Sequence, residues 1–154
     1  LSGIQGFQRG LISQEYFMKV FQHLTHHRTP EDLWTRFFDP APIPETIDVI
    51  ERLKKRFRVV AGTNTVTPHY EVHTQREDYA IFPKVYASHL IHLAKPDPQF
   101  YTHILQAEAV SPVESVFIDD SIQNVESALK LGIHAIHFTE GKALQEALSP
   151  LLVY

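Results

Sequence analysis

Two adjacent acids, Asp119 and Asp120, directly follow the apolar run Val116–Ile118 and are the first residues whose types and spacing suggest chemistry. Two ionised carboxylates about 5 Å apart repel by roughly 3 kcal/mol at an effective dielectric constant of about 20, unless a cation or a shared proton compensates. Carboxylate oxygens are hard ligands and the chain has no cysteine, so the pair indicates Mg²⁺ rather than a softer metal. A second interpretation stays open, in which Asp120 caps the helix that begins near Ser121 while Asp119 faces solvent.

Three further polar residues could complete an anion site. Lys95 precedes Pro96 and Pro98, which restrict the backbone ahead of a predicted helix. A rigidly placed ammonium group could neutralise a nucleophile or bind a phosphate. Thr63 and Asn64 end another apolar run, where a hydroxyl and free N–H groups could bind an anionic oxygen. Taken alone, each feature also fits a solvated lysine or an ordinary turn.

The elements that must position these residues follow from an alternation of short apolar runs and amphipathic segments. Strands are predicted at 58–63, 84–88, 115–119 and 134–139, and helices at about 69–78, 97–108, 121–131 and 141–152. This alternation is typical of βαβ units, which form a parallel sheet covered on both faces. Ligands of such sheets bind at the carboxyl ends of the strands, where the polar residues are Thr63, Asn64, Ser88, Asp119, Asp120, Ser121 and Thr139.

Proline marks a predicted domain boundary. Pro40, Pro42 and Pro44 alternate, and three prolines at this spacing cannot lie inside a helix. Residues 1–39 are predicted to be a helical unit, with Ser13 as an N-cap, and residues 43–154 to be the α/β unit.

The motifs together resemble the haloacid dehalogenase-like (HAD) hydrolase superfamily, in the subgroup with a small helical cap that contains sugar-phosphate and nucleotide phosphatases. The matching segments are Val59–Asn64, Lys95–Phe100 and Val116–Val125, the last followed by Ala128 and Leu131–Ile133, and Gly10–Phe17 is similar to the start of a cap helix. The resemblance implies a Rossmann-like doubly wound parallel sheet over 43–154, with residues 1–39 as part of the cap.

The resemblance also implies a reaction, in which an aspartate attacks phosphorus and water hydrolyses the resulting aspartyl-phosphate with the help of Mg²⁺. Thr63 would hydrogen-bond the phosphoryl group, with Asn64 beside it, and Lys95 would neutralise the phosphate and the nucleophile. Asp119 and Asp120 would hold Mg²⁺, directly or through water. Asn124, at a position where many members have another acid, would orient the metal-bound waters.

One part of the family pattern is absent. The family's nucleophile and general acid form an Asp-x-Asp motif on the central strand of the sheet, and none of the seven aspartates here has another two positions on. We therefore expect the central strand to be absent from this chain and the 154 residues to be a truncated piece of a longer protein. A missing N-terminal segment or a second copy in a homodimer would then supply the strand, and the 154 residues alone would be inactive.

Composition excludes several other classes of function. The formal net charge of −4 gives no reason to expect nucleic-acid binding, and no apolar run is long enough for a membrane span. We expect a cytoplasmic protein that acts on a small phosphorylated metabolite. Two alternatives remain: a 2-haloacid dehalogenase, which needs no metal, and a catalytically inactive binding or regulatory domain of the same fold.

Overall fold

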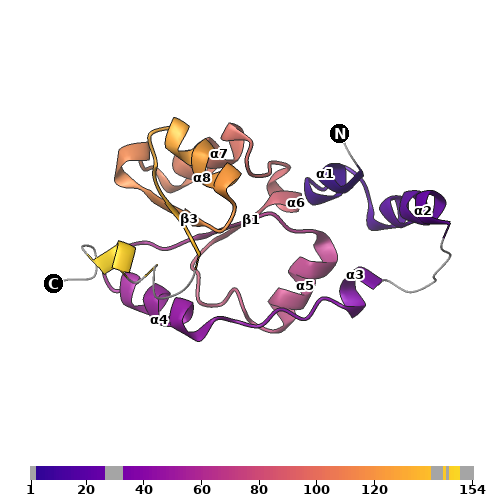
Figure 1. The fold of residues 1–154 in the computed structure, drawn as a ribbon, viewed down its shortest axis with the longest axis horizontal. Helices are drawn as coiled ribbons and strands as arrows, with labels where there is room; N and C mark the ends of the chain where they lie inside the picture. Colours follow the sequence, from indigo (N-terminus) through magenta and orange to yellow (C-terminus); the bar gives the residue numbers. More distant parts are fainter. Residues whose placement is uncertain (1–2, 27–32, 140–143, 145, 150–154) are drawn as a thin grey trace. The chain divides into compact units, whose positions relative to one another are not determined.

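The computed structural model describes residues 3–26, 33–139, 144 and 146–149 (Figure 1). In chain order the elements are α1 (Gly3–Gln8), α2 (Gln14–Thr25), α3 (Leu33–Arg36), α4 (Pro44–Leu53), β1 (Ala61–Thr63), α5 (Thr67–Gln75), β2 (Val85–Ala87), α6 (Ser88–Ile91), α7 (Pro98–Glu108), the 3₁₀ turn η1 (Pro112–Glu114), β3 (Val116–Asp119), α8 (Ile122–Lys130) and β4 (His134–His137). Of the helix predicted over 141–152, residues 144 and 146–149 are helical, and the rest lies outside the described residues.

The described strands form two parallel ladders. β1 pairs with β2, with Thr63 opposite Ala87, and β3 pairs with β4, with Asp119 opposite His137. α5 lies in the connection between β1 and β2, and α8 joins β3 to β4, so the predicted βαβ units and the α/β class are confirmed. β1 is shorter than predicted: residues 58–60 are not part of the strand, and its pairing with β2 covers three residues.

The chain divides into two compact units that interleave along the sequence. One unit holds residues 1–41 and 61–94, and the other holds 42–60 and 95–154. This grouping by contact is not the same as the predicted division into a cap and a core, which stays a prediction.

In the first unit, α1 and α2 pack together around Phe7 and Phe17, whose rings stack with centroids 4.7 Å apart. Ser13 is the N-cap of α2 as predicted, and its hydroxyl accepts a hydrogen bond from the Tyr16 N–H at 3.1 Å. Gly10 has a φ of +63°, and a Cβ there would lie 2.3 Å from the carbonyl oxygen of His89. The turn after α1 therefore requires a residue without a side chain.

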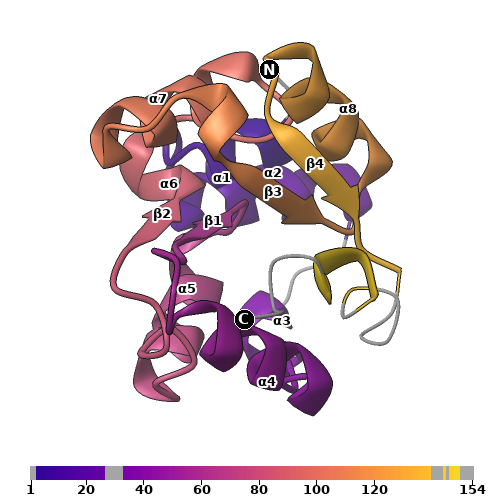
Figure 2. The same ribbon diagram turned by 90° about the vertical axis from the view of Figure 1, so that its left-hand side faces the viewer.

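The second unit is built around β3 and β4. α8 packs against both strands, as Figure 2 shows, and α7 contacts α8. A separate apolar cluster contains Val49 and Leu53 of α4 with Leu144 and Leu148, and Ile118 of β3 packs against it. The last residue of β3 is Asp119. The packing of α8 on this ladder holds the end of the strand, and with it the backbone of Asp119, in place.

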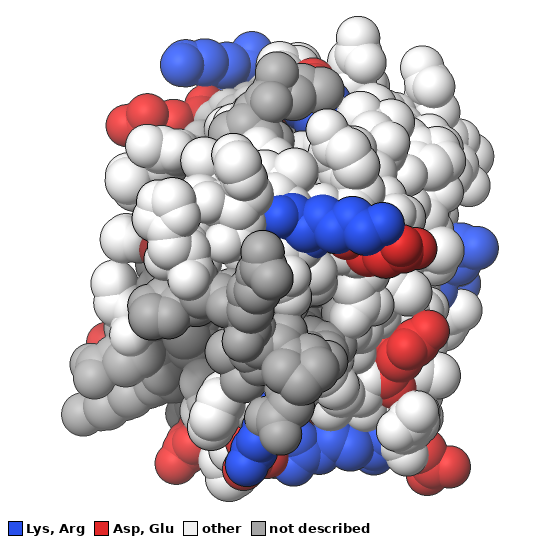
Figure 3. Space-filling view, turned by 90° about the vertical axis from the view of Figure 1, so that its right-hand side faces the viewer, with Lys and Arg blue, Asp and Glu red and all other residues white. Residues whose placement is uncertain are grey.

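Two surface properties bear on possible partners. In the part of the chain that the structure describes, no helix is both long and apolar enough to cross a membrane. On the face drawn in Figure 3, Lys and Arg groups lie among Asp and Glu groups and do not merge into one basic patch of described residues.

Candidate active site

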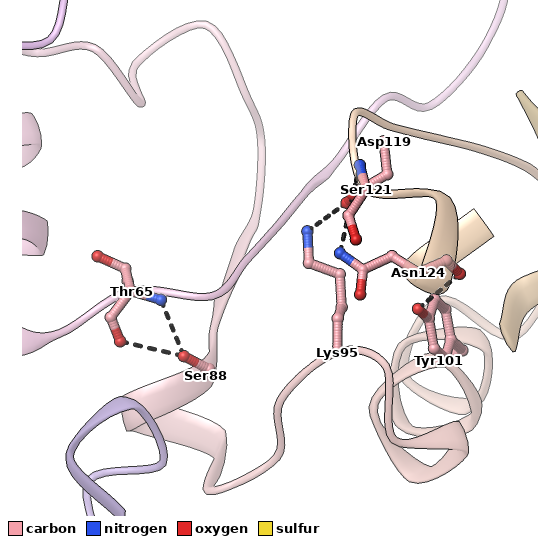
Figure 4. Close-up of polar contacts among 7 residues, drawn as sticks. All are labelled: Thr65, Ser88, Lys95, Tyr101, Asp119, Ser121 and Asn124. Carbon is pink, nitrogen blue, oxygen red and sulfur yellow. Dashed lines mark hydrogen bonds and ion pairs between the residues drawn. The ribbon is translucent and has the colours of Figure 1, made fainter. Parts of the chain in front are cut away.

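Lys95 and Asp119 form a buried ion pair at the carboxyl end of β3 (Figure 4). The Lys95 Nζ lies 2.7 Å from the Asp119 Oδ2, and the two side chains are 10% and 5% exposed. Lys95 lies in a turn between α6 and α7, so the folded chain brings together residues that are 24 positions apart. A buried charge needs a partner of opposite sign, and each of these two residues is the other's.

The carboxylate of Asp119 also accepts two other hydrogen bonds. Its Oδ1 accepts from the Asn124 Nδ2 at 2.8 Å and from the Ser121 N–H at 2.9 Å. Burial disfavours the charged form, but the hydrogen bond and charge of Lys95, together with Asn124 and the Ser121 N–H, outweigh it and hold the pKa of Asp119 below its usual value of 3.8. Asp119 is therefore a buried, ionised carboxylate, and the alternative in which it faces solvent is wrong.

Asp120 has the opposite environment. Its side chain is exposed, and within the described residues no hydrogen bond or ion pair engages its carboxylate. Its carbonyl oxygen accepts a hydrogen bond from the His137 Nε2 at 2.9 Å, which ties this backbone to the end of β4. The N-cap of α8 is Ser121, so Asp120 does not cap the helix. Of the two adjacent acids, Asp119 is thus buried and Asp120 is exposed.

Aromatic rings surround the ion pair on the side of the core. The Lys95 Nζ lies 5.7 Å from the centroid of Phe117 and 6.0 Å from that of Phe100, and the rings of Tyr101 and Phe117 meet edge to face at 5.1 Å. The faces of Phe117 and Phe100 add a weaker attraction for the ammonium group. Lys95 is therefore held by the Asp119 carboxylate and contacts aromatic rings as well.

Sequence reasoning missed two residues that support this arrangement. The Tyr101 hydroxyl donates to the Asn124 carbonyl at 2.9 Å, and the Ser127 hydroxyl donates to the Pro96 carbonyl at 2.6 Å. No spacing rule identifies either bond, because each joins segments that are distant in sequence. The one available signal was the three-residue spacing of Asn124 and Ser127, which places both on the same face of a helix.

The raised pKa of the buried Tyr101 hydroxyl leads us to expect that the protein loses stability in alkali. Burial, followed by the charge of Asp119, raises the pKa of Tyr101 to about 12, against 10.0 in the unfolded chain. The unfolded state then loses this proton first, so the free energy of unfolding should fall by up to about 2 kcal/mol between pH 10 and 12. Urea unfolding across this range measures the fall. Tyr101→Phe should remove that part of the slope, and an unchanged slope in the variant would contradict the assignment.

Thr63 and Asn64 belong to the other compact unit. Thr63 is the last residue of β1 and is half-buried, and Asn64 follows it. A hydrogen bond to Thr63 lowers the pKa of Tyr79, although burial, the larger effect, leaves that pKa raised overall. The structure thus brings Lys95, Asp119 and Asn124 together, whereas a shared rim with Thr63 and Asn64 stays a prediction.

Ser88, another polar residue at a strand end, has a structural role. It is fully buried after β2, and its hydroxyl accepts from the Thr65 N–H at 3.0 Å and lies 2.7 Å from the Gln8 carbonyl oxygen (Figure 4). Its hydrogen bonds tie the turn after β1 to the end of α1. The hydrogen bonds of the Ser88 hydroxyl are therefore made within the protein, and this residue stabilises the fold.

The sequence places His69 and His73 four residues apart, just after Pro68, and this pattern at the start of a helix predicts two surface residues. In the structure the pair instead packs in an aromatic cluster. The rings of Phe38 and His69 stack at 3.7 Å, and the His73 Nδ1 lies 2.8 Å from the Asp78 Oδ2. The expectation of surface positions is wrong, because both imidazoles are half-buried. Nothing in this cluster gathers three metal ligands among the described residues.

The arrangement at β3 is compatible with Mg²⁺. The carboxylate of Asp120 is exposed, its oxygens are hard ligands, and Mg²⁺ commonly binds one or two carboxylates and keeps several waters. No group of three His, Asp or Glu side chains suited to a metal occurs in the described ranges, so these side chains do not form a complete coordination shell by themselves.

The fold and the site define an α/β protein with a lysine–carboxylate pair at the end of a parallel strand. The sequence profile of the haloacid dehalogenase-like hydrolases matches residues 7–132, and the chain belongs to this family. The fold class predicted from the motifs is confirmed.

Relatives and a solved structure agree with this assignment. A sesquiterpene phosphatase of Aspergillus oryzae is 34% identical over 84 residues, which cover 53% of this chain and 42% of that protein. A D-ribitol-5-phosphate phosphatase of Bacteroides thetaiotaomicron is 24% identical over 162 residues, covering 96% of this chain and 77% of that protein. The magnesium complex of a HAD family enzyme from the same bacterium superposes with a TM-score of 0.80 at 24% identity, covering 96% of this chain and 80% of the other.

Proposed function

We propose that this chain is part of a Mg²⁺-dependent phosphatase that acts on a small phosphorylated metabolite through an aspartyl-phosphate. The observation that carries the proposal is the buried pair of Lys95 and Asp119, together with the exposure of Asp120, the next residue in the sequence. An ammonium group fixed by one acid, with a second acid available to a cation, suits a site where phosphate and metal charges must be balanced. The names of the two phosphatase relatives support the same reaction.

Each residue has a distinct part in this proposal. Lys95 would neutralise the phosphate and the attacking carboxylate, and Asp119 would hold the ammonium group in place. Asn124 would fix the orientation of Asp119 through its 2.8 Å hydrogen bond and would lie behind the metal ligands. Thr63 would donate its hydroxyl to a phosphoryl oxygen, with Asn64 beside it.

Asp120 would be the direct Mg²⁺ ligand, and Asp119 would contribute to the metal site through its charge and through water. Mg²⁺ supplies positive charge that stabilises the transferring phosphoryl group. The free carboxylate of Asp120 and its fixed backbone at His137 support this division between the two acids.

The nucleophile would come from outside these 154 residues, because the sequence has no Asp-x-Asp. A preceding segment of the same protein, or the equivalent segment of a second copy in a homodimer, would carry it on a strand of the sheet. The 154 residues alone are then expected to release no phosphate.

A generic aryl phosphate and a 2-haloacid, each assayed with the full-length gene product with and without Mg²⁺, test the proposal against its alternatives. Phosphate release that needs Mg²⁺ supports the phosphatase. Halide release without metal would favour the dehalogenase. If the full-length protein contains an Asp-x-Asp motif and still turns over neither compound, the remaining interpretation is a catalytically inactive binding or regulatory domain. Activity of a verified 154-residue chain would overturn the placement of the nucleophile.

A further inference from the structure

One buried hydroxyl, that of Ser127, contacts the segment that carries Lys95. Ser127 is 8% exposed, and its Oγ donates to the Pro96 carbonyl oxygen at 2.6 Å. Pro96 directly follows Lys95, and both lie in a turn outside any helix or strand. The hydrogen bond from Ser127 is thus a tertiary constraint on a segment that no ladder or helical turn holds.

The same helix also holds the other half of the ion pair. Asn124 and Ser127 are three residues apart on α8 and lie on one face. Asn124 donates to the Asp119 carboxylate, while Ser127 donates to the residue after Lys95. Two side chains of α8 therefore hold the ion pair: Asn124 binds the Asp119 carboxylate, and Ser127 binds the backbone next to Lys95.

Tyr101 strengthens this connection from α7. Its hydroxyl donates to the Asn124 carbonyl at 2.9 Å. Tyr101 and Ser127 are buried and Asn124 is half-buried, so the hydrogen bonds of these side chains lie in a medium of low dielectric constant and are stronger than they would be in water. Removing the Ser127 hydroxyl would leave the Pro96 carbonyl without this donor.

We propose that Ser127 is a positioning residue, which aims Lys95 at Asp119 by holding the Pro96 carbonyl against α8. A lysine side chain has four rotatable bonds, so the ammonium group reaches its position reliably only if the backbone that carries it is fixed. The importance of this positioning for catalysis rests on the proposed function, whereas the positioning itself can be tested without any activity.

The test measures the coupling between Lys95 and Asp119 with and without the Ser127 hydroxyl. Urea unfolding at pH 7 is recorded for the parent, Lys95→Met, Asp119→Asn and the double variant, which gives the coupling between the two side chains. We expect a coupling of about tenfold or more in the unfolding equilibrium constant, the range typical of residues in contact. The same four proteins carrying Ser127→Ala should show a coupling at least about threefold smaller, since interaction energies depend on geometry.

This design separates positioning from a general structural role. If Ser127 only adds stability, Ser127→Ala will raise the unfolding equilibrium constants of all four proteins by the same factor and leave the coupling unchanged, which would overturn the proposal. Alanine is a better helix former than serine, so helix propensity does not imitate the expected loss. Ser127→Thr, which keeps the hydroxyl, should retain the coupling even if its extra methyl group costs stability.

Ser115 provides a matched control in the same compact unit. Its hydroxyl donates to the Pro112 carbonyl at 2.8 Å, so Ser115→Ala removes the same kind of hydrogen bond just before the first residue of β3, whereas Asp119 is the last residue of that strand. The coupling should be unchanged in this variant, and an equal loss from Ser115→Ala would overturn the proposal. If Ser127→Ala weakens the coupling while Mg²⁺-dependent phosphate release by the full-length protein is unchanged, the positioning is supported and the proposed catalytic role of Lys95 is wrong.

Discussion

Lys95→Met is expected to lower the free energy of unfolding by about 3 kcal/mol at pH 7, because it leaves a buried carboxylate without its cation. Asp119 is 5% exposed on its side chain, so water replaces the lost ammonium group poorly. Asn124 and the Ser121 N–H still donate to the carboxylate, which keeps the loss near the lower end of the range for broken buried pairs. Urea unfolding, followed by circular dichroism, measures the change.

Lys19→Met serves as the control for this substitution. Lys19 also pairs with an acid, Glu15, at 2.7 Å, but these side chains are 71% and 77% exposed. An exposed pair on one helix contributes about 0.5 kcal/mol or less, so this variant should remain close to the parent. Equal losses from the two substitutions would show that the Lys95 pair is not a buried ion pair in solution.

Asp120→Asn is expected to lower the rate of Mg²⁺-dependent phosphate release by the full-length protein about 100-fold or more. In the proposed site this substitution removes a charged ligand from the metal. The free energy of unfolding should change by less than about 0.5 kcal/mol, since the Asp120 side chain is exposed. A colorimetric phosphate assay over a Mg²⁺ titration, with urea unfolding of the same proteins, measures both quantities.

The control for Asp120 is another exposed acid in the same compact unit. Asp48 lies on α4, and Asp48→Asn removes the same charge at a distance in sequence from β3. Asp48→Asn should leave the Mg²⁺ dependence unchanged. If Asp120→Asn does likewise, Asp120 is not a metal ligand. If Asp120→Asn lowers the free energy of unfolding as much as Lys95→Met does, the Asp120 carboxylate has a structural partner instead.

Much of the fold was predictable because its signals are local. Apolar runs and amphipathic segments identified the four strands and most of the helices, and the Ser13 cap followed from its own neighbours. The bounds of β1 were not predictable, because Val59 and Val60 are as apolar and β-branched as a typical strand yet have no ladder partner. Pairing depends on another segment of chain, and local composition carries no information about it.

The site was predictable as a set of residues and not as an arrangement. The motifs identified Lys95, both aspartates and Asn124, but gave no reason to separate the two acids. Tyr101 and Ser127 went unnoticed, because a hydroxyl that bonds a distant carbonyl follows no spacing rule. His69 and His73 were assigned to the surface for the same reason: the packing of Phe38 against them is a long-range contact.

By itself, the sequence determined the chemical groups available, the alternation of strands and helices, and the lack of an Asp-x-Asp within these residues. Only the tertiary structure decided which acid is buried with Lys95 and which is exposed. Successive side chains along a strand point to opposite faces, and the position of Lys95, 24 residues away in the chain, determines which of the two acids has a buried cationic partner. That difference depends on distances in space, which cannot be read from the order of adjacent residues.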